Sequence, residues 1–149
     1  MRNKALGAIL MPYIRIGGGA IYQPPLYAHI QTDGSWKPKL ARVAAIVVTA
    51  DGSTTYRRMD QLQAENSTET EWASVAYGIR LALKHQQDTL CMENDNLGVI
   101  QALTQPGIRL RHEYARYYRD QIQRMSAQTA WTGVRWIPRE ANRADALFR

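Results

Sequence analysis

The order of strand-like and helix-like segments narrows the possible folds of this chain more than any other property of its sequence. Three strand-like segments precede the first helical pattern, and strands and helices alternate after it. This order predicts an α/β fold with a mixed five-stranded sheet, in which an antiparallel three-strand meander is joined by parallel strands and flanked by helices. The expected strands are 26–32, 43–49, 54–62, 89–92 and 132–137, and the expected helices run from about 68 to 85, 97 to 106, 110 to 125 and 141 to 148.

The tripeptide Asp-Gly-Ser occurs twice, at residues 33–35 and 51–53, each time after an apolar segment. Locally both are typical of a turn, because Gly adopts positive φ without steric cost and Asp hydrogen-bonds its own backbone. The second triplet lies between two strands of the expected meander, so we interpret it as a hairpin turn. The first must be judged together with the other acidic residues.

Four acids fall at the ends or faces of expected elements: Asp33, Glu71, Asp95 and Asp145. Taken one at a time, each has an ordinary explanation as a turn residue, a helix cap or a surface charge. Glu71 stands out because Gly78, seven residues later, would let its helix approach the sheet closely. If the strands that precede Asp33 and Asp95 are neighbours, their carboxylates lie side by side and repel unless they are protonated or bind cations.

Oxygen-only ligands suit Mg²⁺ or Mn²⁺ rather than zinc, and none of the three histidines lies near these acids in the sequence. Two such ions can hold the attacking and leaving oxygens of a phosphodiester in line. The pattern therefore favours a divalent cation, Mg²⁺ or Mn²⁺, at a site made of carboxylates.

The charge of the chain also indicates a partner that carries phosphate groups. The formal net charge is +6, and nine arginines lie between Arg109 and Arg149 against four acids. A basic chain of this kind favours a nucleic acid partner. No apolar run approaches the roughly 18 residues that a membrane helix needs, and the single cysteine suits a reducing compartment, so we expect a cytoplasmic protein that does not bind membranes.

The domain organisation expected from the sequence is simple. Residues 1–25 contain three consecutive glycines, followed by two consecutive prolines, which indicates an irregular N-terminal extension. Residues 26–149 are long enough for one compact domain, expected to be monomeric.

Four motifs occurring in this order resemble type 1 ribonuclease H, particularly its reverse-transcriptase-like branch. They are TDGS at 32–35, NSTETEWASVAYGI at 66–79, ENDNLGVIQAL at 93–103 and WIPREANRADALFR at 136–149. The resemblance covers about residues 26–149 and implies a ribonuclease H-like catalytic domain. It identifies Asp33, Glu71, Asp95 and Asp145 as the catalytic, metal-binding acids, in preference to Glu69 and Glu93.

The resemblance also implies an activity: hydrolysis of the RNA strand of RNA/DNA hybrids by water, with two Mg²⁺ ions, to give 5′-phosphate and 3′-hydroxyl ends. The positions that match the family's substrate contacts are Ser35, Asn66, Ser67, Arg139 and Asn142. Asn66 and Ser67 are equally typical of helix capping. Arg139 stands where many relatives carry a histidine that assists product release.

One departure from the family keeps other functions open. The segment after the first triplet reads WKPKLARVAA instead of a Gly- and Asn-rich loop, although Lys37, Lys39 and Arg42 can meet phosphates there. The alternatives are a nuclease of the same fold that acts on another nucleic acid, such as a junction, single-stranded DNA or double-stranded RNA, and a non-catalytic nucleic-acid-binding module.

Overall fold

The computed structural model describes residues 11–19 and 24–149, apart from the side chains of residues 61 and 62. Its core is a six-stranded sheet with the strand order β1-β6-β5-β2-β3-β4. The strands are β1 (Ile14–Arg15), β2 (Ala28–Lys37), β3 (Leu40–Val48), β4 (Thr54–Leu62), β5 (Thr89–Asn94) and β6 (Trp131–Trp136). The helices are α2 (Ser67–Lys84), α3 (Leu97–Thr104) and α4 (Glu113–Ser126), followed by two short 3₁₀ helices, η1 (Arg139–Ala141) and η2 (Arg143–Phe148).

The sheet confirms the expected topology. β2, β3 and β4 form the antiparallel meander, and β5 pairs in parallel with both β2 and β6. All five expected strands are present. A sixth, the two-residue strand β1, comes from the N-terminal extension and pairs antiparallel with β6, so this part of the extension is attached to the sheet.

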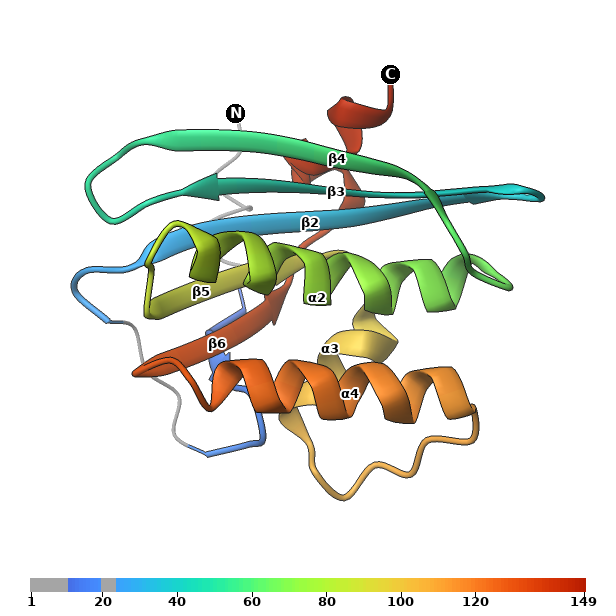
Figure 1. Ribbon diagram of the computed structural model, residues 1–149. Helices are drawn as coiled ribbons and strands as arrows, with labels where there is room; N and C mark the ends of the chain where they lie inside the picture. The colour runs from blue at the N-terminus through green and yellow to red at the C-terminus, as the bar shows by residue number, and fades with distance from the viewer. Residues whose placement is uncertain (1–10, 20–23) are drawn as a thin grey trace.

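The two faces of the sheet are covered unequally, as Figure 1 shows. α2 and α4 lie side by side against one face, whereas the C-terminal 3₁₀ helices lie against the other. Alternate residues of β3 reveal the division: Ala45 and Val47 pack into the core on the helix side, while Ala44 and Ile46 pack with Ala144 on the opposite side. We call these the helix face and the C-terminal face.

The two Asp-Gly-Ser triplets differ in structure. Asp51 and Gly52 form the β3–β4 turn, with Gly52 at a φ of +95° and the Asp51 carboxylate accepting a hydrogen bond from Ser53 N. Asp33 and Gly34 lie within β2, paired with Ala44 and Val43 of β3. The expectation that the first strand ends at Thr32 is therefore wrong, because β2 continues through the triplet to Lys37.

Two glycines let α2 pack unusually close to β2. A Cβ on Gly78 of the helix would lie 2.4 Å from Thr32 Cγ2, and a Cβ on Gly34 of the strand would lie 2.9 Å from the backbone of Thr70. Such distances leave no room for any side chain. The predicted close approach at Gly78 is thus confirmed, and a second contact at Gly34 holds the first turn of the helix against the strand.

The last helix differs from the expectation of one helix over 141–148. The segment forms η1 and η2, separated at Asn142, which has an extended backbone (φ −90°, ψ 102°). The Asn142 side chain accepts a hydrogen bond from Ala144 N and so caps η2. Asn competes well with helical backbone bonding in this way, which explains why the helix is interrupted there.

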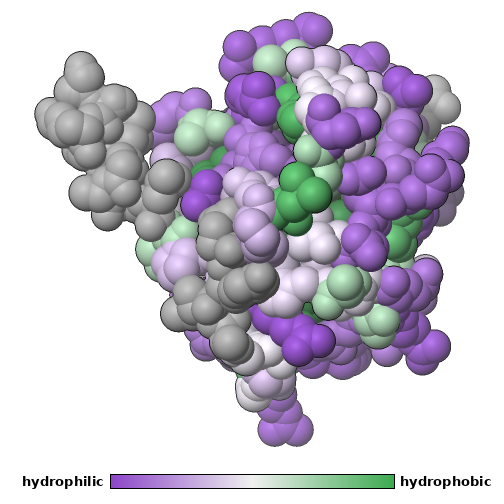
Figure 2. Space-filling view, turned by 90° about the vertical axis from the view of Figure 1, so that its left-hand side faces the viewer, coloured by the Kyte–Doolittle hydropathy of each residue, from purple (hydrophilic) through white to green (hydrophobic). Residues whose placement is uncertain are grey.

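Figure 2 shows one face of the molecule, on which hydrophobic side chains are scattered among polar ones in the described part of the chain. A few large hydrophobic residues, such as Leu26, Leu97 and Tyr117, are exposed, which is normal for a globular surface. None of the helices in the described residues is both long and apolar enough to cross a membrane.

The helix–strand contact can be tested by replacing Gly78 with Ala. We expect a loss of about 1–3 kcal/mol in the free energy of unfolding from overpacking, despite the higher helix propensity of Ala. Gly107→Ala is the control, because a Cβ there would meet nothing within 4 Å, and it should change stability by less than about 0.5 kcal/mol. Chemical denaturation measures both, and equal stability of the two variants would contradict the packing argument.

Candidate metal centre

Three carboxylates from three different elements converge beside the C-terminal end of β5. Asp33 lies in β2, Asp95 directly follows β5, and Glu71 lies in the second turn of α2. One carboxylate oxygen of each lies within 4.8 Å of the others. We call these residues the acidic triad.

The parallel pairing of β2 and β5 brings two of them together. Gln31 lies opposite Glu93 in this register, so the next residues on the same side of each chain are Asp33 and Asp95. Glu71 belongs to α2 on the helix face, and it reaches the other two acids because α2 packs so close to Gly34. The Gly34 N–H donates to both Asp33 Oδ1 (3.0 Å) and Glu71 Oε1 (3.2 Å), which fixes the two carboxylates against each other.

Two buried asparagines, Asn94 at the end of β5 and Asn142 in the C-terminal segment, lie next to the triad. Asn94 and Asn142 both donate to the carbonyl oxygen of Thr32, at 3.1 and 2.8 Å, and Asn142 also donates to Asp95 Oδ2 at 3.3 Å. The Trp136 indole donates to the Asp95 carbonyl at 3.0 Å. These contacts orient Asp95 and tie β2, β5 and the C-terminal segment together next to the triad.

The electrostatics of the triad are unfavourable to three negative charges. Burial, together with the charge of Asp95, raises the pKa of Asp33 to about 7. Burial and then the charges of Asp33 and Asp95 raise the pKa of Glu71 to about 9. The pKa of Asp95 is also raised, mainly by burial, although the hydrogen bond from Asn142 opposes the effect.

A nearby carboxylate shows what the triad lacks. Burial alone would raise the pKa of Glu93, but hydrogen bonds from His29, Gln31 and Arg135 outweigh it and lower the pKa to about 2. Within residues 11–19 and 24–149, by contrast, no basic side chain forms an ion pair with the triad. Three crowded carboxylates without a cationic partner can hold a divalent ion, and an all-oxygen set of this kind fits Mg²⁺ or Mn²⁺.

The triad lines a cleft of about 470 Å³, and several other residues expected at the site lie there too. They are Ser35, Ser67, Arg139 and Asp145. Asp145, the fourth expected acid, is not part of the triad's close grouping. Its carboxylate forms a 2.9 Å ion pair with Arg149, one turn later in the chain.

The two asparagines expected to bind substrate have other contacts in the structure. Asn66 caps α2, since its Oδ1 accepts from Glu69 N at 2.9 Å. Asn142 is only 4% exposed and contacts Asp95 and the backbone. Of the basic residues after the first triplet, Lys37 and Lys39 are exposed at the β2–β3 hairpin, whereas the Arg42 guanidinium stacks over the Phe148 ring at 5.1 Å.

The sequence profile of the reverse transcriptase-like family matches residues 31–147, a span that contains the whole triad. The chain belongs to the reverse transcriptase-like family. No curated protein matches the sequence significantly.

Solved structures show what fold this family member has. Ribonuclease H1 from the archaeon Halobacterium salinarum is 19% identical, with a TM-score of 0.71, and the match covers 80% of this chain and 92% of that one. The N-terminal ribonuclease H domain of a Mycobacterium tuberculosis protein is 23% identical (TM-score 0.71; 82% and 90% covered). A compost metagenome ribonuclease H1, solved with an RNA/DNA hybrid, is 16% identical (TM-score 0.67; 80% and 92% covered). The fold is therefore ribonuclease H-like.

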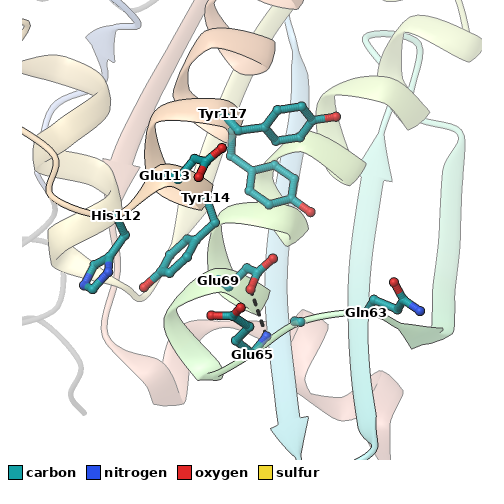
Figure 3. Close-up of a pocket in the computed structure, with 9 residues that line it drawn as sticks. Gln63, Glu65, Glu69, His112, Glu113, Tyr114 and Tyr117 are labelled. Atoms are coloured by element: carbon teal, nitrogen blue, oxygen red, sulfur yellow. Dashed lines mark hydrogen bonds between the residues drawn. The ribbon is translucent and has the colours of Figure 1, made fainter.

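The surface has two further hollows besides the cleft at the triad. One, of about 420 Å³, shares Arg139 and Asp145 with the cleft and is also lined by Arg143 and Arg149. The other, of about 730 Å³, lies between the start of α2 and the start of α4 (Figure 3) and is lined by tyrosines and by Glu65, Glu69 and Glu113. The 730 Å³ hollow, which we call the tyrosine groove, has no Lys or Arg in its lining and is therefore unsuited to bind phosphate. The 420 Å³ hollow, which we call the arginine-lined hollow, is better suited to it.

The raised pKa values predict how the metal-free protein responds to pH. Asp33 has a folded pKa near 7 against an ordinary value of 3.8, so the stability contributed by its protonated form is present below pH 4 and is lost as the pH rises through 7. In Asp33→Asn this loss is absent. With chelator present, we expect this variant to be more stable than the wild type by at least about 1 kcal/mol above pH 7, with the difference shrinking toward pH 4.

Asp51→Asn is the matched control, because Asp51 is exposed in the turn and hydrogen bonds from Thr49 and Ser53 lower its pKa. Asp51→Asn should be slightly less stable than the wild type. Adding Mg²⁺ should raise the melting temperatures of the wild type and of Asp51→Asn, but not that of Asp33→Asn. Thermal melts from pH 4 to 8 provide the measurement. A pH-independent difference between Asp33→Asn and the wild type would contradict the assigned repulsion.

Proposed function

We propose that this protein is a Mg²⁺-dependent endonuclease that hydrolyses the RNA strand of RNA/DNA hybrids, leaving 5′-phosphate and 3′-hydroxyl ends. The observation that carries the proposal is the acidic triad: a buried carboxylate and two half-buried ones from three elements, with one oxygen of each within 4.8 Å of the others. Membership of the reverse transcriptase-like family and a fold shared with ribonucleases H1 support it. One of those enzymes was solved bound to an RNA/DNA hybrid.

Each residue of the proposed site has a distinct role. Asp33, Glu71 and Asp95 would hold the ions, Gly34 N fixes the orientation of two of these carboxylates, and Asn142 orients the third. Asp145 would join them after exchanging its contact with Arg149 for a cation. When bound, two Mg²⁺ ions supply charge neutralisation at the phosphate and hold the attacking and leaving oxygens in line.

Substrate binding is assigned to the residues around the cleft. Arg139, Arg143 and Arg149 line the hollow that adjoins the triad, and guanidinium groups there are suited to contact phosphates on either side of the scissile one. Ser67, at the first turn of α2, and Ser35 line the cleft itself. A hydroxyl there is suited to contact a 2′-hydroxyl, the group that distinguishes RNA from DNA.

The substrate assignment is tested by a cleavage panel. Labelled RNA/DNA hybrid, double-stranded RNA, single-stranded RNA, single-stranded DNA and a DNA junction are incubated with Mg²⁺ or Mn²⁺. We expect cleavage of the RNA strand of the hybrid alone, and a loss of at least roughly 100-fold in Asp95→Asn, because removing one carboxylate ligand costs several kcal/mol of charge stabilisation. Asp51→Asn, the turn control, should cleave normally.

The panel also separates the alternatives. Preferential cleavage of a substrate other than the hybrid would replace the proposed substrate while retaining the nuclease. Binding of hybrid without cleavage under either metal would contradict the enzyme proposal and favour a non-catalytic binding module.

The arginine-lined hollow generates its own prediction. Arg139→Ala should raise KM for the hybrid with little change in kcat, and should lower the slope of log affinity against log salt by about one phosphate contact. Arg124→Ala is the control, because Arg124 lies on α4 and pairs with Asp120. Fluorescence anisotropy at 50–200 mM salt measures the slopes, and identical slopes for the two variants would exclude a phosphate contact by Arg139.

A further inference from the structure

Behind the triad lies a second cluster of polar side chains, centred on Glu93, which is only 3% exposed. Both of its oxygens accept hydrogen bonds from side chains on other elements. The donors are Tyr13 Oη (3.1 Å), His29 Nε2 (2.8 Å), Gln31 Nε2 (2.8 Å) and the Arg135 guanidinium, whose Nε lies at 2.8 Å. With this many partners, Glu93 is held as an anion in one orientation rather than left free to bind a ligand.

Gln31 connects this cluster to the C-terminal segment. Because its NH₂ group donates to Glu93, its oxygen must point the other way, and there it accepts from Arg143 N at 3.1 Å. The same NH₂ group also donates to the carbonyl oxygen of Ala141 at 3.3 Å. One side chain of β2 thus holds both backbone neighbours of Asn142.

Asn142 carries the connection to the metal centre. Its amide donates to Asp95 Oδ2 and to the carbonyl oxygen of Thr32. The contacts therefore run without a gap from Glu93 through Gln31 to the backbone around Asn142, and from its side chain to Asp95. Glu93, which lies outside the cleft, is therefore linked to Asp95, which lines it, through Gln31 and Asn142.

The N-terminal segment completes the cluster from outside the family match. Tyr13 is 3% exposed, and the Arg135 guanidinium lies 4.2 Å from the centre of its ring. Ile16 N and Gly17 N donate to the backbone of Thr132 and Leu103, so this segment is bonded to β6 and to the end of α3. The family match begins only at residue 31.

We propose that Glu93 is a positioning residue for the metal centre: together with Tyr13 it locks Gln31, which holds the 141–143 backbone so that Asn142 orients Asp95. This inference rests on the proposed function for its consequence, because it assigns Asp95 as a metal ligand. It gives residues 11–17 a role in catalysis, although they lie outside the family match and far from the cleft along the chain.

The test is Mn²⁺ binding to the full chain by calorimetry, with Gln31→Leu and Tyr13→Phe. Gln31→Leu removes the connection, and we expect Mn²⁺ affinity to fall by roughly 10- to 100-fold, as is usual when a partner of a metal ligand is lost. Tyr13→Phe keeps the ring over Arg135 and removes only the hydroxyl, so the loss should be smaller, at most about fivefold. In both variants the backbone amides of Ala144 and Asp145 should exchange hydrogen faster, while those of α2 remain protected.

Ile122→Val separates positioning from general stability. Ile122 is fully buried on the helix face, so this variant should lower the melting temperature without changing Mn²⁺ affinity or exchange in the C-terminal segment. Unchanged Mn²⁺ affinity and unchanged exchange in Gln31→Leu would overturn the proposal. Wild-type protein that binds Mn²⁺ but leaves the hybrid intact would refute the proposed function alone, and wild-type protein that binds no Mn²⁺ would overturn both.

Discussion

The close packing of α2 on β2 is the contact on which the acidic triad depends. Gly78 removes a side chain on the helix and Gly34 removes one on the strand, so the first turns of α2 lie directly over the strand. This brings Glu71 to Asp33, and the parallel pairing of β2 with β5 brings Asp95 to the same place. The helix–sheet core thereby holds together three carboxylates that repel one another, and this repulsion favours a divalent cation.

Much of this arrangement follows from sequence patterns. The Asp-Gly pair at 51–52 between two strand-like segments predicted a turn that the structure has, and the order of strands and helices predicted the mixed sheet. The structure of the first triplet was harder to predict, because Asp-Gly-Ser has the same local preferences wherever it occurs. Only the distant partner Thr70 reveals that Gly34 serves helix packing rather than a turn. Local propensity cannot report a contact made between residues so far apart in the sequence.

The C-terminal segment shows a second limit. Its apolar spacing predicted one helix, but Asn142 caps the chain in the middle and its amide contacts Asp95 and Thr32. Glu93 and Gln31 give no local signal of importance, since each would ordinarily be a surface residue of a strand. Their burial arises because the C-terminal segment and the Tyr13 side chain pack against them. The acidic triad is thus supported on one side by a hydrophobic core and on the other by a buried polar cluster.

Anomalous scattering from crystals soaked in Mn²⁺ tests the central claim most directly. We expect Mn²⁺ to be bound by carboxylate oxygens of Asp33, Glu71 and Asp95 at about 2.0–2.2 Å, the distance typical of small divalent ions. No Mn²⁺ should bind at Glu93, whose oxygens already accept hydrogen bonds. Crystals of Asp33→Asn should lose the signal. Well-ordered crystals of wild-type protein with no Mn²⁺ at the triad, or with Mn²⁺ retained in Asp33→Asn at full occupancy, would contradict the central claim.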